Sequence, residues 1–164
     1  MSRKSVLAKI LPLFFAVVSL GLVTVSCSDD DDDEIKAIKS ITMSPETESS
    51  LIGLLGQNYS WRKDLPDESL LVISNTEDFH SYFGSEANID IDFDKYTLLC
   101  GWVIAYSTAT TIESQNLTFN KKKNSYIYSI TLNYADGGYQ VISSIYFCAL
   151  YNKLSKKVEL EMHR

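Results

Sequence analysis

Histidine is scarce in this chain of 164 residues, and the sequence motifs that usually mark catalytic sites are missing as well. The two histidines, His80 and His163, stand in no H-x-x-x-H or Cys/His spacing, which argues against a zinc site. The sequence also lacks G-x-S-x-G, a Cys/His pairing signature and a glycine-rich phosphate loop. We therefore expect a non-enzymatic protein with no metal centre and no cofactor.

Clusters of basic residues are almost absent as well. The single cluster is Lys121, Lys122 and Lys123, which has the composition of a solvated hairpin tip. Affinity for a phosphate backbone depends on clustered Lys and Arg side chains. We therefore expect no nucleic-acid partner.

One segment of the sequence matches the opening of a calcium-binding loop but lacks the rest of the pattern. Asp90, Asp92 and Asp94 alternate as D-x-D-x-D, but the glycine and the final acid that such a loop needs are replaced by Lys95 and Gly101. The apolar residues between the aspartates alternate with them. The pattern favours an extended segment at a sheet edge, with the aspartates facing water.

Long hydrophobic runs are absent except near the N-terminus. Residues 10–25 form an almost uncharged apolar run behind Arg3, Lys4 and Lys9, which is the layout of a secretory signal peptide. A membrane-spanning helix is the alternative, but the run is shorter than the ~20 residues that such a helix needs, and it contains proline, serine and glycine. We predict that residues 1–26 are a signal peptide and are removed.

Cys27 follows this run directly and is similar to the modified cysteine of a bacterial lipoprotein signal. Behind it come a serine and an unbroken acidic run, made of Ser28, Asp29, Asp30, Asp31, Asp32, Asp33 and Glu34. This stretch resembles the export signal of Bacteroidetes lipoproteins, which implies a protein on the outer face of the outer membrane. Physically, a block of like charges stays extended, so residues 27–34 are also expected to be a tether between the lipid anchor and a folded domain.

The charge balance supports a separate tether. The chain has 15 basic and 21 acidic residues, and removal of residues 1–26 leaves 12 and 21, a net charge of −9. Six of those acids belong to the tether, so the remainder carries only −3. About 130 residues remain, which is enough for one core, and we predict a single domain over residues 35–164.

Strand patterns dominate this domain. Apolar and aromatic runs predict strands over residues 70–74, 96–107, 111–120, 124–134, 139–151 and 157–162. The spacing of apolar residues at 35, 38 and 41 fits an edge strand, or a transition from tether to domain, better than an independent helix. One short helix is expected between Asn75 and Gly84, whereas the glycines of residues 51–61 favour a strand and loop. Residues 122–124 and 135–138 are expected to be hairpin connections. The fold class is therefore α+β, a mainly antiparallel β-sheet of five to seven strands with one short helix.

The order of these motifs resembles the PrcB C-terminal-like domain. The matching residues are 75–83 in the helix, the acidic segment 91–95 before the long strand, and Gly137, Gly138 and Tyr139. That family is named for a lipoprotein that stabilises a surface protease complex in an oral spirochaete. The resemblance implies a non-catalytic module that binds an envelope protein and stabilises or regulates its complex.

A glycan-binding accessory lipoprotein is the alternative function. The chain has ten tyrosines and two tryptophans, and aromatic rings can provide a stacking platform for sugars. Strand propensity explains the same abundance. Fluorescence changes on addition of polysaccharide would distinguish the two explanations.

Two cysteines remain once Cys27 is acylated. Cys100 and Cys148 each lie in the middle of a predicted long strand, in a chain whose export permits disulfides. A bridge requires the two strands to be neighbours or to face each other, with Cα atoms within ~7 Å. Two buried thiols are the alternative, since free cysteine packs well as a small apolar residue.

Overall fold

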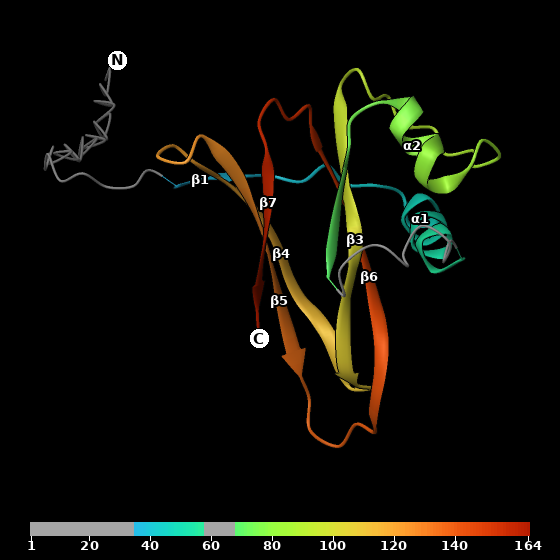
Figure 1. The fold of residues 1–164 in the computed structure, drawn as a ribbon, viewed down its shortest axis with the longest axis vertical. Coiled ribbons are helices and arrows are strands. Elements are labelled where there is room, and N and C mark those ends of the chain that lie inside the picture. Colours follow the sequence, from blue (N-terminus) through green and yellow to red (C-terminus); the bar gives the residue numbers. More distant parts are fainter. Residues whose placement is uncertain (1–34, 58–67) are drawn as a thin grey trace, which may run out of the picture. The chain divides into compact units, whose positions relative to one another are not determined.

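The structure is a computed structural model that describes residues 35–57 and 68–164 (Figure 1). These residues belong to a unit that spans residues 32–164. The predicted signal peptide, the lipid attachment at Cys27 and the acidic run lie outside the described residues. Within the described part, no helix is long and apolar enough to cross a membrane.

The described residues form seven strands and two helices. In chain order they are β1 Ile35–Ile38, α1 Pro45–Gln57, β2 Ser69–Ile73, α2 Thr76–Phe83, β3 Tyr96–Ser107, β4 Thr110–Asn120, β5 Ser125–Tyr134, β6 Gln140–Asn152 and β7 Val158–His163. This confirms the predicted α+β class with mainly antiparallel strands. The predicted long strands agree with β3 to β7 to within two residues at each end.

The strands divide between two sheets. The four-stranded sheet has the order β1-β4-β5-β7 and is called the outer sheet here; the three-stranded one has the order β2-β3-β6 and is called the inner sheet. All pairs are antiparallel except β5 and β7, which run parallel. The chain passes from the inner sheet to the outer one after β3, returns after β5, and leaves again after β6.

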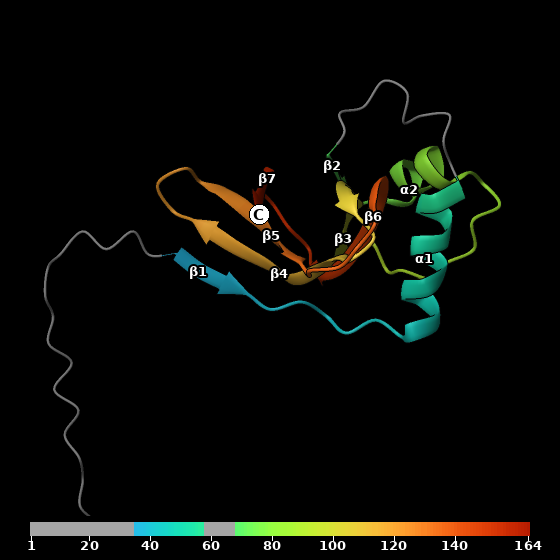
Figure 2. The same cartoon turned by 90° about the horizontal axis from the view of Figure 1, so that it is seen from below.

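The inner sheet is a middle layer that is covered on both faces along most of β3 and the second half of β6. Alternate residues of β3 go to opposite sides: Leu98 and Cys100 pack with α1 and α2, whereas Leu99 and Val103 pack with side chains of the outer sheet. Figure 2 shows the helices on one side of the inner sheet and the outer sheet on the other. Because both faces are covered, seven consecutive residues of β3 are buried, and the run has no polar alternation.

The prediction of a strand and loop over residues 51–61 was wrong for residues 51–57, which belong to helix α1, Pro45–Gln57. Residues 58–61 lie outside the described part of the chain. The Ser44 hydroxyl accepts a hydrogen bond from the amide of Thr47 at 3.2 Å, and Pro45 occupies the first helical position, where its missing N–H is not needed. Leu51 and Leu55, one turn apart, are fully buried in the core cluster under the inner sheet. This burial outweighs the low helix propensity of the two glycines in the helix.

Helix α2 confirms its predicted limits. Asn75 is the N-cap, and its side-chain oxygen accepts a hydrogen bond from the amide of Asp78 at 2.7 Å. Gly84 ends the helix with a φ of 86°, a left-handed value that favours glycine. Phe79 and Phe83 are buried on one face, with ring centroids 4.8 Å apart.

Residues 135–138 do not form the predicted hairpin connection. They lead from β5 in the outer sheet to β6 in the inner sheet, so the strands on either side do not pair. Gly137 has a φ of 89°, and a Cβ atom on Gly138 would collide with the Ser107 hydroxyl and with Ala109. The glycines were read correctly as a turn, but the local sequence does not specify which strands pair. The other predicted hairpin, at residues 122–124, is confirmed between β4 and β5.

Candidate functional site

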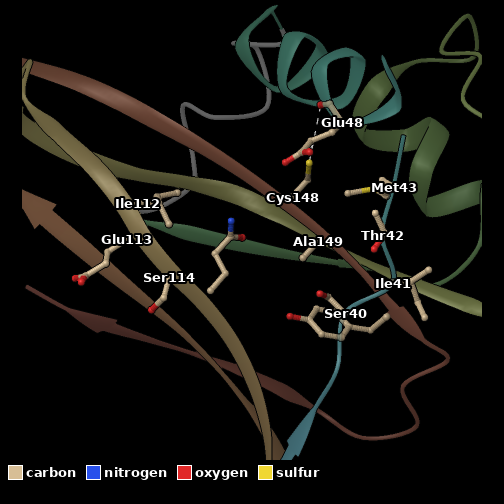
Figure 3. A pocket seen from close by; sticks show the side chains of 12 residues that line it. Ser40, Ile41, Thr42, Met43, Glu48, Ile112, Glu113, Ser114, Cys148 and Ala149 are labelled. Atoms are coloured by element: carbon tan, nitrogen blue, oxygen red, sulfur yellow. Dashed lines mark hydrogen bonds between the residues drawn. The ribbon is translucent and has the colours of Figure 1, made fainter. Parts of the chain in front are cut away.

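The first candidate site is a pocket between the segment that leads into α1, strand β4 and strand β6. Its volume is about 460 Å³ (Figure 3). The polar groups on its wall include those of Ser40, Glu48, Glu113, Cys148 and Tyr151. In Figure 3 the side chains of Glu48 and Glu113 lie on different sides of the pocket, so the two carboxylates do not form a pair.

The groups in this pocket are poorly suited to acid–base or nucleophilic chemistry at neutral pH. Burial, with the nearby charge of Glu48, raises the pKa of Cys148 from its ordinary value of 9.0 to about 12. Burial also raises the pKa of Tyr151 to about 12. Both groups therefore stay protonated, and a protonated thiol is a weak nucleophile. Among the described residues, no three His, Cys, Asp or Glu side chains are grouped as metal ligands would be.

The structure brings the two predicted cysteines together. Cys100 of β3 and Cys148 of β6 are register partners in neighbouring antiparallel strands, and both are buried free thiols in the same core cluster. The Cys148 sulfur also lies 4.0 Å from the backbone carbonyl of Glu48 in α1 (Figure 3). The condition for pairing, that the two strands be neighbours, is therefore met.

The second candidate site is an exposed apolar surface where β3 ends and β6 begins. It consists of Tyr106, Tyr139, Val141 and Ile142, called the distal patch here. The exposed fractions of Tyr139 and Ile142 are 84% and 74%, and Tyr106 is 55% exposed. Tyr106, Val141 and Ile142, with Gln140, line a surface cavity of about 350 Å³.

An irregularity in strand pairing lies within this patch. The register of β3 with β6 shifts between Ala105 and Ser107, so that Val141 and Ile142 together lie opposite Tyr106. Such a bulge bends a strand and changes the direction of its side chains. Here it lies where β6 is uncovered, since residues 140–143 are all exposed. The backbone of Tyr139 is bonded to Thr108, with N–O distances of 3.0 and 3.1 Å, which holds the patch against the turn after β3.

The distal patch carries no charge of its own. Residues 96–112 and 137–152, which contain β3 and β6, include no Asp, Glu, Lys or Arg. Tyr139 belongs to the Gly-Gly-Tyr motif noted in the sequence, but nothing there grouped it with Tyr106, Val141 and Ile142. One sequence signal could have indicated the patch, namely the consecutive apolar residues at positions 141 and 142. Neighbouring side chains of a strand point to opposite faces, so one face of the sheet cannot bury both.

The other residues weighed from the sequence have structural roles. As expected, Ile89 and Ile91 pack against the core while Asp90, Asp92 and Asp94 are exposed, although the segment before β3 is a loop and not a strand. Asp92 pairs with Lys95 at 2.6 Å, and this contact lowers the pKa of the carboxyl. The Nδ1 atom of His80 lies 3.1 Å from the carbonyl oxygen of Gly84, at the end of α2.

No protein-family model matches the chain, and neither the curated proteins nor the solved structures contain a significant match to it.

Proposed function

We propose that the protein is a non-catalytic lipoprotein of the outer-membrane surface that binds another envelope protein through the distal patch. The observation that carries this proposal is the exposure of Tyr106, Tyr139 and Ile142 side by side in an uncharged region. Clustered exposed apolar side chains mark interaction sites on soluble domains, whereas single ones need no explanation.

The chemistry of the patch defines the surface that it fits. Tyrosine rings supply large contact area with few rotatable bonds, so little entropy is lost when they are covered. Because β3 and β6 contribute no charge, a charged partner surface would lose its hydration here without gaining an ion pair. The partner surface is therefore an apolar, uncharged region of an envelope protein.

The sequence supports the location. The signal peptide, Cys27 and the run from Ser28 to Asp33 together fit a lipid-anchored protein that faces the cell exterior. Each buried CH₂ of an acyl chain contributes about 0.8 kcal/mol, so two or three chains hold the protein at the membrane. The acidic tether then keeps the domain away from the headgroups, and the distal patch stays open to proteins in the same envelope.

The test compares two exposed isoleucines on different strands. Ile142→Glu places a charge in the distal patch, and Ile35→Glu places the same charge on β1, where the isoleucine is 57% exposed. Full-length lipidated protein is purified from its native cells after mild crosslinking. We expect wild type and Ile35→Glu to retain the same envelope protein, and Ile142→Glu to lose it. Retention by all three would rule out the distal patch as the contact.

Glycan binding is a second candidate because Tyr139 and Tyr106 expose their rings in this same region. A sugar stacked on these rings would change tyrosine fluorescence, and Tyr139→Ala would remove the change. A fluorescence response to polysaccharide, together with unchanged protein capture by Ile142→Glu, would favour the glycan function over the protein-binding one.

A further inference from the structure

Cys100 and Cys148 lie directly opposite each other across two neighbouring strands. The register between β3 and β6 is regular from Tyr96 to Ala105, so the pairing of these two cysteines lies within an unbroken stretch. Both belong to the core cluster under α1 and α2, so their side chains leave the inner sheet on the same face. The two sulfur atoms therefore share one small volume of the core.

The hydrogen bonding of β6 shows whether Cys100 and Cys148 are a hydrogen-bonded or a non-hydrogen-bonded pair of the antiparallel ladder. The carbonyl oxygen of Leu150 accepts a hydrogen bond from the amide of Ile41 at 2.7 Å, on the edge of β6 that faces away from β3. Leu98 and Leu150 are thus a pair without mutual hydrogen bonds, and this state recurs every second residue along an antiparallel ladder. Two positions further, Cys100 and Cys148 are a pair of the same kind.

Pairs of this kind have the closest backbones in an antiparallel sheet. Their Cα atoms are about 4.5 Å apart, compared with about 5.5 Å in hydrogen-bonded pairs. Disulfides span Cα separations of about 4.4–6.8 Å. The strands can therefore accept a bridge without being pulled together or pushed apart.

We propose that Cys100 and Cys148 form a disulfide that joins β3 to β6 in the exported protein. The two thiols become one S–S bond, and each sulfur gives up one proton and one electron. The oxidant is the disulfide of a thiol–disulfide oxidoreductase of the envelope, which becomes a dithiol. This inference does not depend on the proposed binding function.

The burial of both sulfurs determines when the bridge forms. Cys100 is fully buried, and Cys148 is 4% exposed at the wall of the pocket in Figure 3. Burial raises the pKa of both thiols, so the thiolate that attacks a donor disulfide is rare once the domain has folded. Oxidation therefore occurs before the helices cover the inner sheet, and the finished bridge is shielded from external reductants.

Peptide mapping of the native lipoprotein tests this directly. Cells are lysed in denaturant that contains an alkylating agent, so that buried thiols are blocked as well, and the purified full-length protein is digested with trypsin without reduction. Cleavage after lysine separates residues 96–121, which contain Cys100, from residues 124–153, which contain Cys148. We expect the two peptides to be joined, and to separate when reductant is added. Two alkylated peptides in the unreduced sample would overturn the proposal.

A double-mutant cycle provides an independent measurement. If the bridge exists, Cys100→Ala and Cys148→Ala each break it and each lower the thermal midpoint by on the order of 10 °C, and the double variant is little worse than either. If the residues are separate thiols, the two losses are smaller and add. Additive losses would therefore contradict the bridge, even if every variant folds.

Discussion

At the scale of single residues, two glycines occupy opposite environments. A Cβ atom on Gly101 of β3 would collide with the backbone carbonyl of Ser69 in β2 and with the ring of Phe147. A Cβ atom on Gly53, inside α1, would meet nothing within 4 Å. The first glycine permits two strands to approach closely, whereas the second has no packing function.

Alanine at these two positions should therefore change stability in opposite directions. Gly101→Ala should lower the free energy of unfolding by about 1–3 kcal/mol or more, because the Ser69 backbone cannot move aside. Gly53→Ala should raise it by roughly 0.5–1 kcal/mol, because alanine is the better helix former. Urea denaturation measures both changes, and two variants of equal stability would contradict this account of the glycines.

Tyr151 is one of the buried groups that make the domain sensitive to alkaline pH. Its side chain is 1% exposed, and burial raises its pKa from 10.0 to about 12. An acid whose pKa is raised by folding contributes fully to stability below its unfolded pKa and loses that contribution as pH rises through the folded value. The urea concentration at the unfolding midpoint should therefore decrease as the pH is raised from 10.0 to about 12. Tyr151→Phe should weaken this pH dependence, and an unchanged slope would assign it to other groups.

At the scale of elements, the N-cap of α2 is the best test of a local signal. Asn75 accepts a hydrogen bond from the Asp78 amide and donates one to the Asp78 carboxylate, both at 2.7 Å. Asn75→Ala should cost about 1 kcal/mol of unfolding free energy, whereas Asn75→Ser keeps an acceptor and should cost much less. Equal losses for the two variants, measured by urea denaturation, would show that the cap is not what stabilises the start of α2.

The elements that could be predicted from the sequence are those with a strong local signal. The cap and the aromatic face of α2 are local, and so is the β-branched and aromatic composition of β3 to β6. Helix α1 was missed because Gly53 and Gly56 lower helix propensity, while the burial of Leu51 and Leu55 that stabilises it depends on the inner sheet. Its local start signal is Ser44 followed by proline at the first helical position.

The pairing of strands could not be predicted because it is a tertiary property. Nothing near β5 specifies that the next strand, β6, belongs to another sheet. The candidate sites depend on this arrangement, since the distal patch needs β3 beside β6 and the two cysteines need the same pairing. The fully uncharged run of β3 was the available hint, because a strand without polar alternation is buried on both faces.

At the scale of the whole molecule, the N-terminal segment and the domain are expected to act separately. Replacing Asp29, Asp30, Asp31, Asp32 and Asp33 with serine should leave lipid attachment and the folding of the domain unchanged. It should remove the protein from the cell exterior, as judged by labelling of intact cells with a membrane-impermeant amine reagent. Unchanged labelling would refute the export function of the acidic run.

Cys27→Ala is the matched control for that experiment. Without the cysteine no acyl chain can be attached, so this variant should leave the membrane fraction altogether. The serine variant should remain in it. The two variants thus separate anchoring, which we predict to depend on one residue, from transport to the outer face, which we predict to depend on the charge that follows.

The division of the sheets also fixes the order in which the domain can assemble. The ribosome completes β3 before β4 and β5, and it makes β6, the longest partner of β3, only after both. During that interval the twelve residues of β3 are a nascent apolar segment without their main partner, and α1 lacks the strand that it covers. Folding therefore cannot follow synthesis step by step. A chaperone that shields extended apolar chains would hold this segment until β6 arrives.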